Sequence, residues 1–182
     1  MVASDSLSVT VHIEDLEAWT DVTKYDFDEG TEQGWTGGTV TDEVSVEVGG
    51  YSYRSAERAG AAAEKTISRS ITLPTRANVR LSFFVVLRNR NADTTYGRIA
   101  YLEGLRVTVN GTEVFRIPSR IRSVSAPART TTYSSPWLKV ALDLSAYAGQ
   151  TVTVSLIANL SSNYGVAYAS AIYDRIVIAG KD

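Results

Sequence analysis

The fold of this chain is decided by the stretch W-L-K-V-A-L-D-L-S-A-Y-A-G-Q-T-V-T-V-S-L-I-A-N, residues Trp137–Asn159, and by the later stretch A-I-Y-D-R-I-V-I-A, residues Ala171–Ala179. Apolar and polar residues alternate in two runs of the first stretch, with the apolar positions at Leu138, Val140 and Leu142 and at Val152, Val154 and Leu156. A period of two is typical of a β-strand with one face on a core. Between the runs, Asp143 can cap a short helical turn that Gly149 closes. The pattern therefore predicts two strands joined by one tight turn, and then a last strand.

The same alternation continues along the rest of the chain. It is clearest at Val79–Leu87 and at Leu105–Val109, and Asn110-Gly111 then supplies a hairpin turn with positive φ angles. The segment Ala56–Lys65 has no apolar stripe and is interrupted by a glycine, so it predicts a loop that leads into a strand at Thr66–Leu73. Many closely spaced strands with few helices predict an all-β sandwich or barrel.

Two segments stand apart from this pattern. Residues 1–21 contain an alternating run, Leu7–Ile13, followed by a polar link, and they precede the main domain at residues 22–182. This first segment is interpreted as an added edge strand, an arm exchanged with another subunit, or the end of a preceding domain. The segment Pro118–Pro136 is rich in Ser, Thr and Arg without clear periodicity, which predicts a long and functional loop.

Composition excludes several classes of function. The 182 residues have a formal net charge of −2, and no large basic stripe indicates nucleic-acid binding. The chain contains no cysteine, which excludes disulfides and thiolate metal sites. Its one histidine, His12, leaves little support for a Ser-His-Asp triad or a histidine metal site. No apolar run reaches the roughly 20 residues of a membrane helix. Arginine outnumbers lysine, which is compatible with a GC-rich or thermophilic source. We therefore expect a non-enzyme that neither inserts into a membrane nor binds nucleic acid.

Several motifs resemble those of galactose-binding-like jelly rolls, which include carbohydrate-binding modules and MAM-like accessory domains. Y-D-F-D-E-G-T-E-Q-G-W (Tyr25–Trp35) resembles their first strand, and the deciding stretch is similar to their W…V-D-L-S-x-Y-x-G segment. The last strand resembles their closing D-D-I pattern, except that Arg175 stands where a second aspartate is common. The resemblance covers residues 25–180. It implies a jelly-roll β-sandwich of two antiparallel sheets, here with an extra N-terminal strand.

The resemblance also implies a structural calcium ion between the first and last strands. Asp28 and Asp174 match the positions of the metal-binding acids, with Asp26 or Glu29 as possible helpers. Strand parity with Ile172, Ile176 and Ile178 predicts that Asp174 points to the core side, where a carboxylate must be paired, hydrogen-bonded or metal-bound. The alternative to Ca²⁺ is that an arginine or backbone amides satisfy Asp174.

A ligand-binding face is predicted from tyrosines in or beside loops, with arginines as polar partners. Aromatic rings stack on sugar rings, and arginine satisfies hydroxyl groups. The candidate ligand-binding residues are Tyr51, Tyr53, Arg54, Tyr96, Arg98, Tyr133 and Tyr164. The alternative for each tyrosine is ordinary packing on a β-sandwich.

Together these features predict a non-catalytic, carbohydrate-binding-like accessory domain of a secreted or cell-surface protein. Its partner would be a glycan. A second interpretation is an assembly subunit of a filament, surface layer or virion, whose partner is a neighbouring subunit paired through Leu7–Ile13. A third is a glycan-active enzyme, which would need two acids that face each other across a cleft.

Overall fold

The computed structural model describes residues 19–47, 50–129, 131–165 and 167–182. The predicted strand Leu7–Ile13 lies outside these residues. The described elements are β1 (Thr20–Tyr25), β2 (Gly38–Thr41), β3 (Ser52–Ser55), β4 (Arg58–Ala59), β5 (Ala63–Thr72), β6 (Asn78–Asn91), β7 (Arg98–Val109), β8 (Thr112–Ile117), β9 (Arg122–Ala126), β10 (Thr131–Ser134), β11 (Leu138–Asp143), the single-turn 3₁₀ helix η2 (Ser145–Tyr147), β12 (Thr151–Ser162) and β13 (Ala167–Lys181). Within the described part of the chain, no helix is long and apolar enough to cross a membrane.

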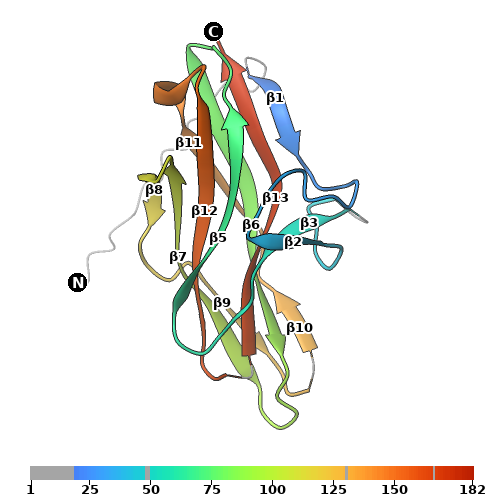
Figure 1. The fold of residues 1–182 in the computed structure, drawn as a ribbon. Helices are drawn as coiled ribbons and strands as arrows, with labels where there is room; N and C mark the ends of the chain where they lie inside the picture. Colours follow the sequence, from blue (N-terminus) through green and yellow to red (C-terminus); the bar gives the residue numbers. More distant parts are fainter. Residues whose placement is uncertain (1–18, 48–49, 130, 166) are drawn as a thin grey trace, which may run out of the picture.

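The strands form two sheets that pack face to face (Figure 1). Sheet A has the order β10-β6-β13-β3-β2, with β1 and β4 also paired to β13 and β11 also paired to β6. Sheet B has the order β5-β12-β7-β8, with β9 also paired to β7. Every strand pairing in the two sheets is antiparallel. The prediction of an all-β sandwich of two antiparallel sheets is therefore confirmed.

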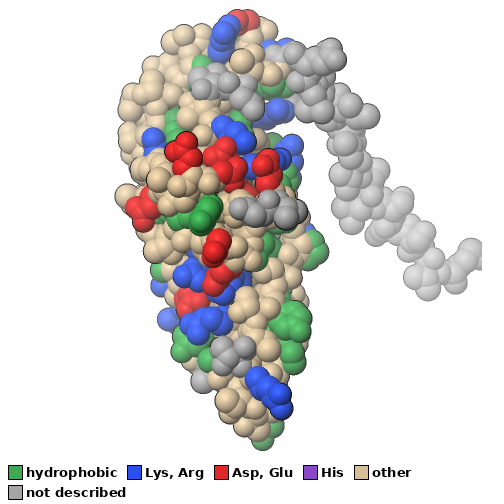
Figure 2. Space-filling view, turned by 90° about the vertical axis from the view of Figure 1, so that its right-hand side faces the viewer, with side chains coloured by type: hydrophobic (Ala, Val, Ile, Leu, Met, Phe, Trp, Pro, Cys, Tyr) green, Lys and Arg blue, Asp and Glu red, His purple; other side chains and the backbone are tan. Residues whose placement is uncertain are grey.

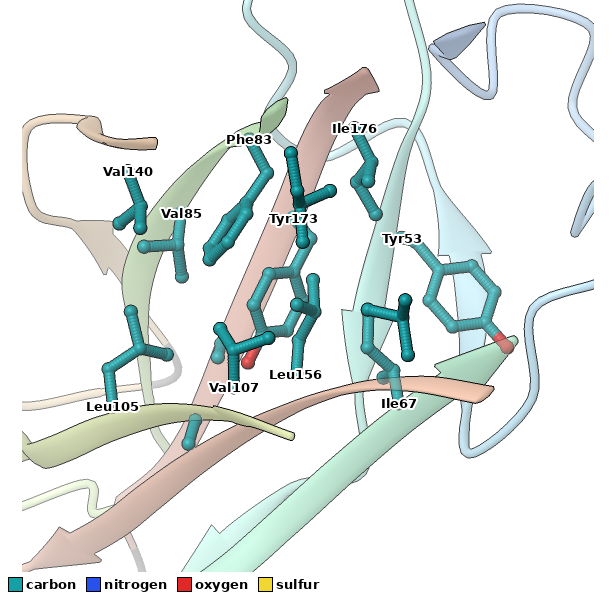
Figure 3. Close-up of a cluster of buried hydrophobic side chains, with 14 of the residues drawn as sticks. Tyr53, Ile67, Phe83, Val85, Leu105, Val107, Val140, Leu156, Tyr173 and Ile176 are labelled. Atoms are coloured by element: carbon teal, nitrogen blue, oxygen red, sulfur yellow. The ribbon is translucent and has the colours of Figure 1, made fainter. Parts of the chain in front are cut away.

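The alternation seen in the sequence determines which side chains enter the core. On β6 the apolar positions from Val79 to Leu87 are buried, whereas Arg80, Ser82 and Phe84 between them face outward and remain partly exposed. Between the sheets, Phe83 and Tyr173 of sheet A point toward Val107 and Leu156 of sheet B (Figure 3). Burial of this apolar surface, at about 25 cal/mol per Å², is the main force that holds the two sheets together.

Trp35 fills the end of the core next to the first strand. Its side chain is fully buried and meets the ring of Tyr25 edge-on, with the ring centroids 5.8 Å apart. This geometry is favoured for aromatic pairs. Trp35 is therefore part of the core.

The predicted turns are also present. Asn110 and Gly111 have φ angles of 50° and 82° and join β7 to β8, as expected for an Asn-Gly hairpin. The Asp143 carboxylate accepts a hydrogen bond of 2.8 Å from the backbone N–H of Ser145, at the start of η2. The segment around Ala56–Lys65 contains only the short β4 before β5 begins at Ala63.

One prediction about the fold is wrong: Pro118–Pro136 is not a structureless loop. It contributes β9 to sheet B, where it pairs with β7, and β10 to sheet A, where it pairs with β6. Each strand has only four or five residues, too few for a period of two to stand out in a segment rich in Ser, Thr and Arg.

A second prediction, the direction of Asp174, is also wrong. The pairing of β13 with β6 shifts register between Asp174 and Val177, and Arg175 at this bulge has a φ angle of 46°. An extra residue in a strand moves each later side chain to the opposite face of the sheet from the one that regular alternation predicts. Tyr173, Ile176 and Ile178 therefore belong to the core cluster, while Asp174 lies on the outer side of sheet A.

The hydroxyl of Tyr173 provides a test of the core. Tyr173 is fully buried, and its hydroxyl has no hydrogen-bond partner among the described residues. We expect Tyr173→Phe to leave the free energy of unfolding unchanged or to raise it by about 1 kcal/mol, because it removes an unsatisfied polar group. The matched control is Tyr53→Phe, since the Tyr53 hydroxyl donates to the carbonyl of Trp35 at 3.1 Å. Urea unfolding should show a loss of about 1 kcal/mol for the control alone, and an equal loss in both variants would contradict the expectation.

Candidate functional site

The outer face of sheet B is an open sheet surface on which polar side chains are grouped. The residues of β5, β12 and β7 that alternate with the core positions point outward here. They meet in register: Asn159 lies opposite both Glu64 and Gly104, and Ile157 lies opposite Arg106. We call this surface the sheet B groove. Its residues are Glu64, Tyr101, Glu103, Gly104, Arg106, Arg120, Ile157, Asn159 and Ser161.

Two arginine–carboxylate forks fix the polar groups of the sheet B groove. Arg106 donates to the two oxygens of Glu64 at 3.1 and 2.6 Å, and Arg120 donates to the two oxygens of Glu103 at 2.9 and 2.9 Å. The Ser161 hydroxyl donates to Glu103 at 2.7 Å. The hydrogen bond from Arg120 holds the pKa of Glu103 below its usual range, so this carboxylate is ionised at neutral pH. Bidentate pairs of this kind hold donors and acceptors in fixed planes.

A depression of about 110 Å³ opens beside these forks, where β7 leaves β8 and begins to pair with β9. Gly104 lies at this crossing, and a Cβ atom there would come within 3.0 Å of the carbonyl oxygen of Ile117. A side chain at position 104 would therefore crowd the crossing strand. The side-chain amide of Asn159 reaches the depression and has no hydrogen-bond partner in the described part of the chain. An amide in this position can both donate to and accept from a ligand.

Aromatic and aliphatic surface lies next to these polar groups. The guanidinium of Arg120 lies over the ring of Tyr101, 3.9 Å from its centroid. Ile157 contributes an apolar side chain to the floor of the depression. Planar hydrogen-bonding groups beside apolar surface suit a ligand with many hydroxyl groups and apolar ring faces.

Three of the predicted ligand-binding residues come together at one tip of the sandwich, in the loops that join β6 to β7 and β12 to β13. The guanidinium of Arg98 lies 4.2 Å from the ring centroid of Tyr164 and 5.3 Å from that of Tyr96. Asp93 forms an ion pair with Arg98, and its carboxylate also accepts hydrogen bonds from the backbone of Thr95 and Tyr96. We call these residues the tip cluster. Both tyrosine rings are exposed, at 62% and 58% for Tyr96 and Tyr164.

The other predicted ligand-binding residues lie elsewhere. Tyr53 is fully buried and packs against Phe27 in a stacked pair, so it is a core residue and does not reach a ligand face. Tyr51 is exposed beside Gly30, and Tyr133 is exposed on β10 of sheet A. Arg54 on β3 forms an ion pair with Glu43. The structure therefore does not bring the seven residues into one site.

Arg54 belongs to a charged network on the outer side of sheet A that the sequence analysis did not find. Its centre is Arg88, only 3% exposed, which pairs with Glu43 at 2.6 Å and with Glu57 at 3.5 Å. Glu57 also binds Arg90 through two hydrogen bonds, at 3.1 and 2.6 Å. Seen from the side of β2 and β3, acidic and basic side chains gather across the middle of the molecule (Figure 2).

Asp174 is the most strongly perturbed carboxyl group among the described residues. It is 2% exposed and accepts hydrogen bonds from the backbone N–H groups of Val46, at 2.7 Å, and Arg175, at 2.6 Å. Burial raises the pKa of Asp174 to about 6, and the charges of Asp28 and Asp26 add to the shift. The backbone amides thus join the last strand to the segment between β2 and β3.

The two acids that the sequence predicts as calcium ligands, Asp174 and Asp28, lie near each other. Asp28 lies close enough to influence Asp174 electrostatically, and a Cβ atom on Gly50 would come within 2.5 Å of an Asp28 carboxylate oxygen. Carboxylate oxygens are the ligands that Ca²⁺ prefers, and a nearby cation would offset their mutual repulsion. Within the described residues, however, no three His, Cys, Asp or Glu side chains surround one point. Backbone carbonyls would therefore have to complete the coordination shell.

The residues of the sheet B groove were missed because they are not distinctive as a sequence. Ser155, Ile157 and Asn159 alternate visibly with core residues, which indicated only an outward face. Their proximity to Glu64 and Arg106 depends on the pairing of β12 with both β5 and β7. The signal available in the sequence is the set of polar outward positions on each strand taken separately, and that signal does not show which strands are neighbours.

Solved structures similar to this chain include carbohydrate-binding modules. The CBM22-1 xylan-binding domain of Paenibacillus barcinonensis Xyn10C is 20% identical, with 91% of this chain and 97% of that chain covered and a TM-score of 0.49. The CBM27-1 module of Caldicellulosiruptor saccharolyticus, solved in complex with mannohexaose, is 11% identical, with coverage of 86% and 96% and a TM-score of 0.49. The K3 cleaved adhesin domain of Lys-gingipain from Porphyromonas gingivalis is 15% identical, with coverage of 88% and 100% and a TM-score of 0.46.

Likeness at this level concerns the fold, and the binding properties of those proteins are not transferred to this chain. No protein-family model matches the chain, and no curated protein matches it.

Proposed function

We propose that this domain is a non-catalytic carbohydrate-binding module that binds a glycan chain in the sheet B groove. The observation that carries the proposal is the open polar face on which two arginine–carboxylate forks, the Asn159 amide and the Tyr101 ring lie side by side. Sugar hydroxyls lie at the ring edge and need donors and acceptors in fixed positions. The faces of a sugar ring pack on aromatic or aliphatic side chains.

The geometry favours binding over catalysis at this groove. Glu64 and Glu103 are its two carboxylates, and each is committed to an arginine through two hydrogen bonds. Hydrolysis of a glycosidic bond needs one carboxyl group that holds a proton at neutral pH. The pKa of Glu103 is shifted in the opposite direction by Arg120, so this group does not suit the role of general acid.

The sequence motifs support a wider context for the proposed module. They resemble accessory domains of secreted and cell-surface proteins, and we extend the proposal to an extracellular or surface-attached location. The proposed Ca²⁺ at Asp174 and Asp28 would be structural, because it would lie against sheet A and not in the sheet B groove.

The test is a glycan array followed by calorimetric titration of the best-binding oligosaccharide. We expect Asn159→Ala to weaken binding about tenfold, since it removes a donor and an acceptor without breaking a contact within the protein. Asn78→Ala, on the other sheet, is the matched control and should bind like the wild type.

Two outcomes would overturn the proposal. One is that no glycan on a broad array binds. The other is that Tyr96→Ala in the tip cluster abolishes binding while Asn159→Ala has no effect, which would move the site to the tip.

A further inference from the structure

The ring of Tyr101 in the sheet B groove is covered by an arginine. Tyr101 points outward from β7, opposite Ser161 of β12 on one side and Ser123 of β9 on the other. The guanidinium carbon of Arg120 lies 3.9 Å from the centroid of the Tyr101 ring. At this distance the guanidinium lies over the ring face, because an approach at the ring edge would keep it farther from the centroid. A sugar ring that stacks on this face must therefore take the place of Arg120.

The carboxylate of Glu103 holds this arginine over the ring. Both carboxylate oxygens accept a hydrogen bond of 2.9 Å from Arg120, and the Ser161 hydroxyl donates to the same carboxylate at 2.7 Å. A bidentate pair fixes the plane of a guanidinium as well as its position. Arg120 is thus aligned with the Tyr101 ring by an acid that is itself hydrogen-bonded to β12.

This cover can be removed by the rotation of one side chain. Arg120 belongs to the segment between β8 and β9, and its side chain is 53% exposed. The backbone beside it is fixed, since the N–H of Ile121 donates to the carbonyl of Leu102 at 2.8 Å. Water replaces the contacts of an exposed guanidinium that turns away, so exposed ion pairs and cation–π contacts each contribute little energy. The side chain can therefore leave the ring while the groove keeps its shape.

We propose that Tyr101 is the stacking residue of the sheet B groove and that Arg120 is its displaceable cover. This inference rests on the glycan-binding function proposed above. An aromatic face attracts a cation and also packs against the apolar face of a sugar ring, so Arg120 and a sugar compete for one surface. A glycan binds with its full affinity only to the open form, and the population of the covered form lowers the observed affinity.

The strand register indicates which ligands the cover affects. Asn159 lies opposite Gly104 and Ser161 lies opposite Tyr101, so the Asn159 amide and the Tyr101 ring are about 7 Å apart along the strands. A chain of several sugars can reach both groups, whereas a single sugar bound at Asn159 does not need the ring. The cover should therefore act on oligosaccharides, and hexasaccharides are the probes that test it.

The first test uses the full chain without a glycan. A photoexcited flavin dye polarises the NMR signals of the tyrosine rings that it can touch, so the signal of Tyr101 measures how open this ring is. We expect Arg120→Ala to raise the Tyr101 signal about fivefold, because the contact with the cation is lost. The exposed ring of Tyr96 is the internal reference and should not change. Tyr101→Phe identifies the signal, and an unchanged Tyr101 signal in Arg120→Ala would overturn the cover.

The second test is calorimetric titration with four neutral hexasaccharides, built from glucose, mannose, galactose or xylose. We expect the best-binding one to bind Arg120→Ala about fivefold more tightly than the wild type, and Tyr101→Ala about tenfold more weakly. The gain should vanish when Arg120→Ala is combined with Tyr101→Ala. Arg76→Ala is the matched control: it breaks an exposed pair with Asp182, on the loop between β5 and β6, and should bind like the wild type.

Two results of the titration would overturn the stacking role of Tyr101. One is weaker binding by Arg120→Ala, which would make the arginine a direct contact of the glycan. The other is an equal gain from Arg120→Ala with and without the Tyr101 ring. If none of the hexasaccharides binds any variant while the flavin signal still rises, the proposed glycan function fails and the cover stands. Thermal unfolding of each variant checks that the fold is retained.

Discussion

Glu57→Gln is expected to lower the free energy of unfolding by about 3 kcal/mol. The carboxylate of Glu57 joins the nearly buried Arg88 to Arg90, and its hydrogen bonds with Arg90 hold the pKa of Glu57 below its usual range. Arginine cannot lose its proton to escape the loss of a partner. The variant therefore leaves Arg88 beside Arg54 and Arg90 with Glu43 as the remaining acid of the network.

Urea unfolding at neutral pH measures this effect, and Glu113→Gln is its matched control. Glu113 pairs with Arg116 on an exposed strand, where an ion pair contributes about 0–1 kcal/mol. If Glu57→Gln and Glu113→Gln lower the free energy of unfolding by the same amount, the stability of the network around Arg88 does not depend on Glu57. A milder loss is expected when Arg88→Met accompanies Glu57→Gln, because the buried charge is then removed as well.

Asp174→Asn is expected to change how stability depends on pH. The pKa of Asp174 is about 6 in the folded protein against an ordinary value of 3.8, so the folded state holds this proton more tightly than the unfolded state. Its contribution is present in full below pH 3.8 and is lost as the pH rises to about 6. One pKa unit corresponds to about 1.4 kcal/mol. Over this pH range the free energy of unfolding of the wild type should therefore fall by about 3 kcal/mol relative to that of Asp174→Asn.

The measurement is the difference in the free energy of unfolding between the variant and the wild type at pH 4 and pH 7, with a calcium chelator present. The carboxyl groups common to both proteins cancel in this difference. Bound Ca²⁺ would favour the ionised form, so added calcium should stabilise the wild type at pH 7 and leave Asp174→Asn unchanged. Parallel pH curves in chelator would contradict the raised pKa, and equal effects of calcium on both proteins would contradict a metal at Asp174.

Much of the fold was predictable because apolar and polar residues alternate regularly along the long strands. β6, β7 and β12 each have 12 or more residues, and a period of two is unmistakable over that length. β9 and β10 have five and four residues, and their pairing depends on β7 and β6, which lie far away in the sequence. The prediction that the Asp174 side chain faces the core failed for a local reason. A single bulge at Arg175 changes which residues of β13 face the core, and the prediction assumed regular alternation through this point.

The candidate sites were less predictable than the fold. Tyr96, Arg98 and Tyr164 were predicted as ligand-binding residues because tyrosines in loops are conspicuous, and the structure shows their side chains next to one another. Tyr53 looks the same in the sequence but lies within β3 on its inward side. The sheet B groove depends on which strands become neighbours, and one sequence contains no direct record of that pairing.

The position of β13 has a consequence for how the domain is made. β13 is the C-terminal strand, yet it pairs with β1, β3, β4 and β6, so sheet A is held together by residues 167–181. During synthesis those residues leave the ribosome after every other strand of sheet A. The earlier strands of sheet A must therefore wait, with the edges that pair with β13 unpaired, until residues 167–181 have emerged. Such non-local pairings fold slowly and expose strand edges to aggregation. The domain is thus expected to complete folding only once residues 167–181 have emerged, and a nascent chain stalled before Ala167 should be sensitive to protease and bound by chaperones.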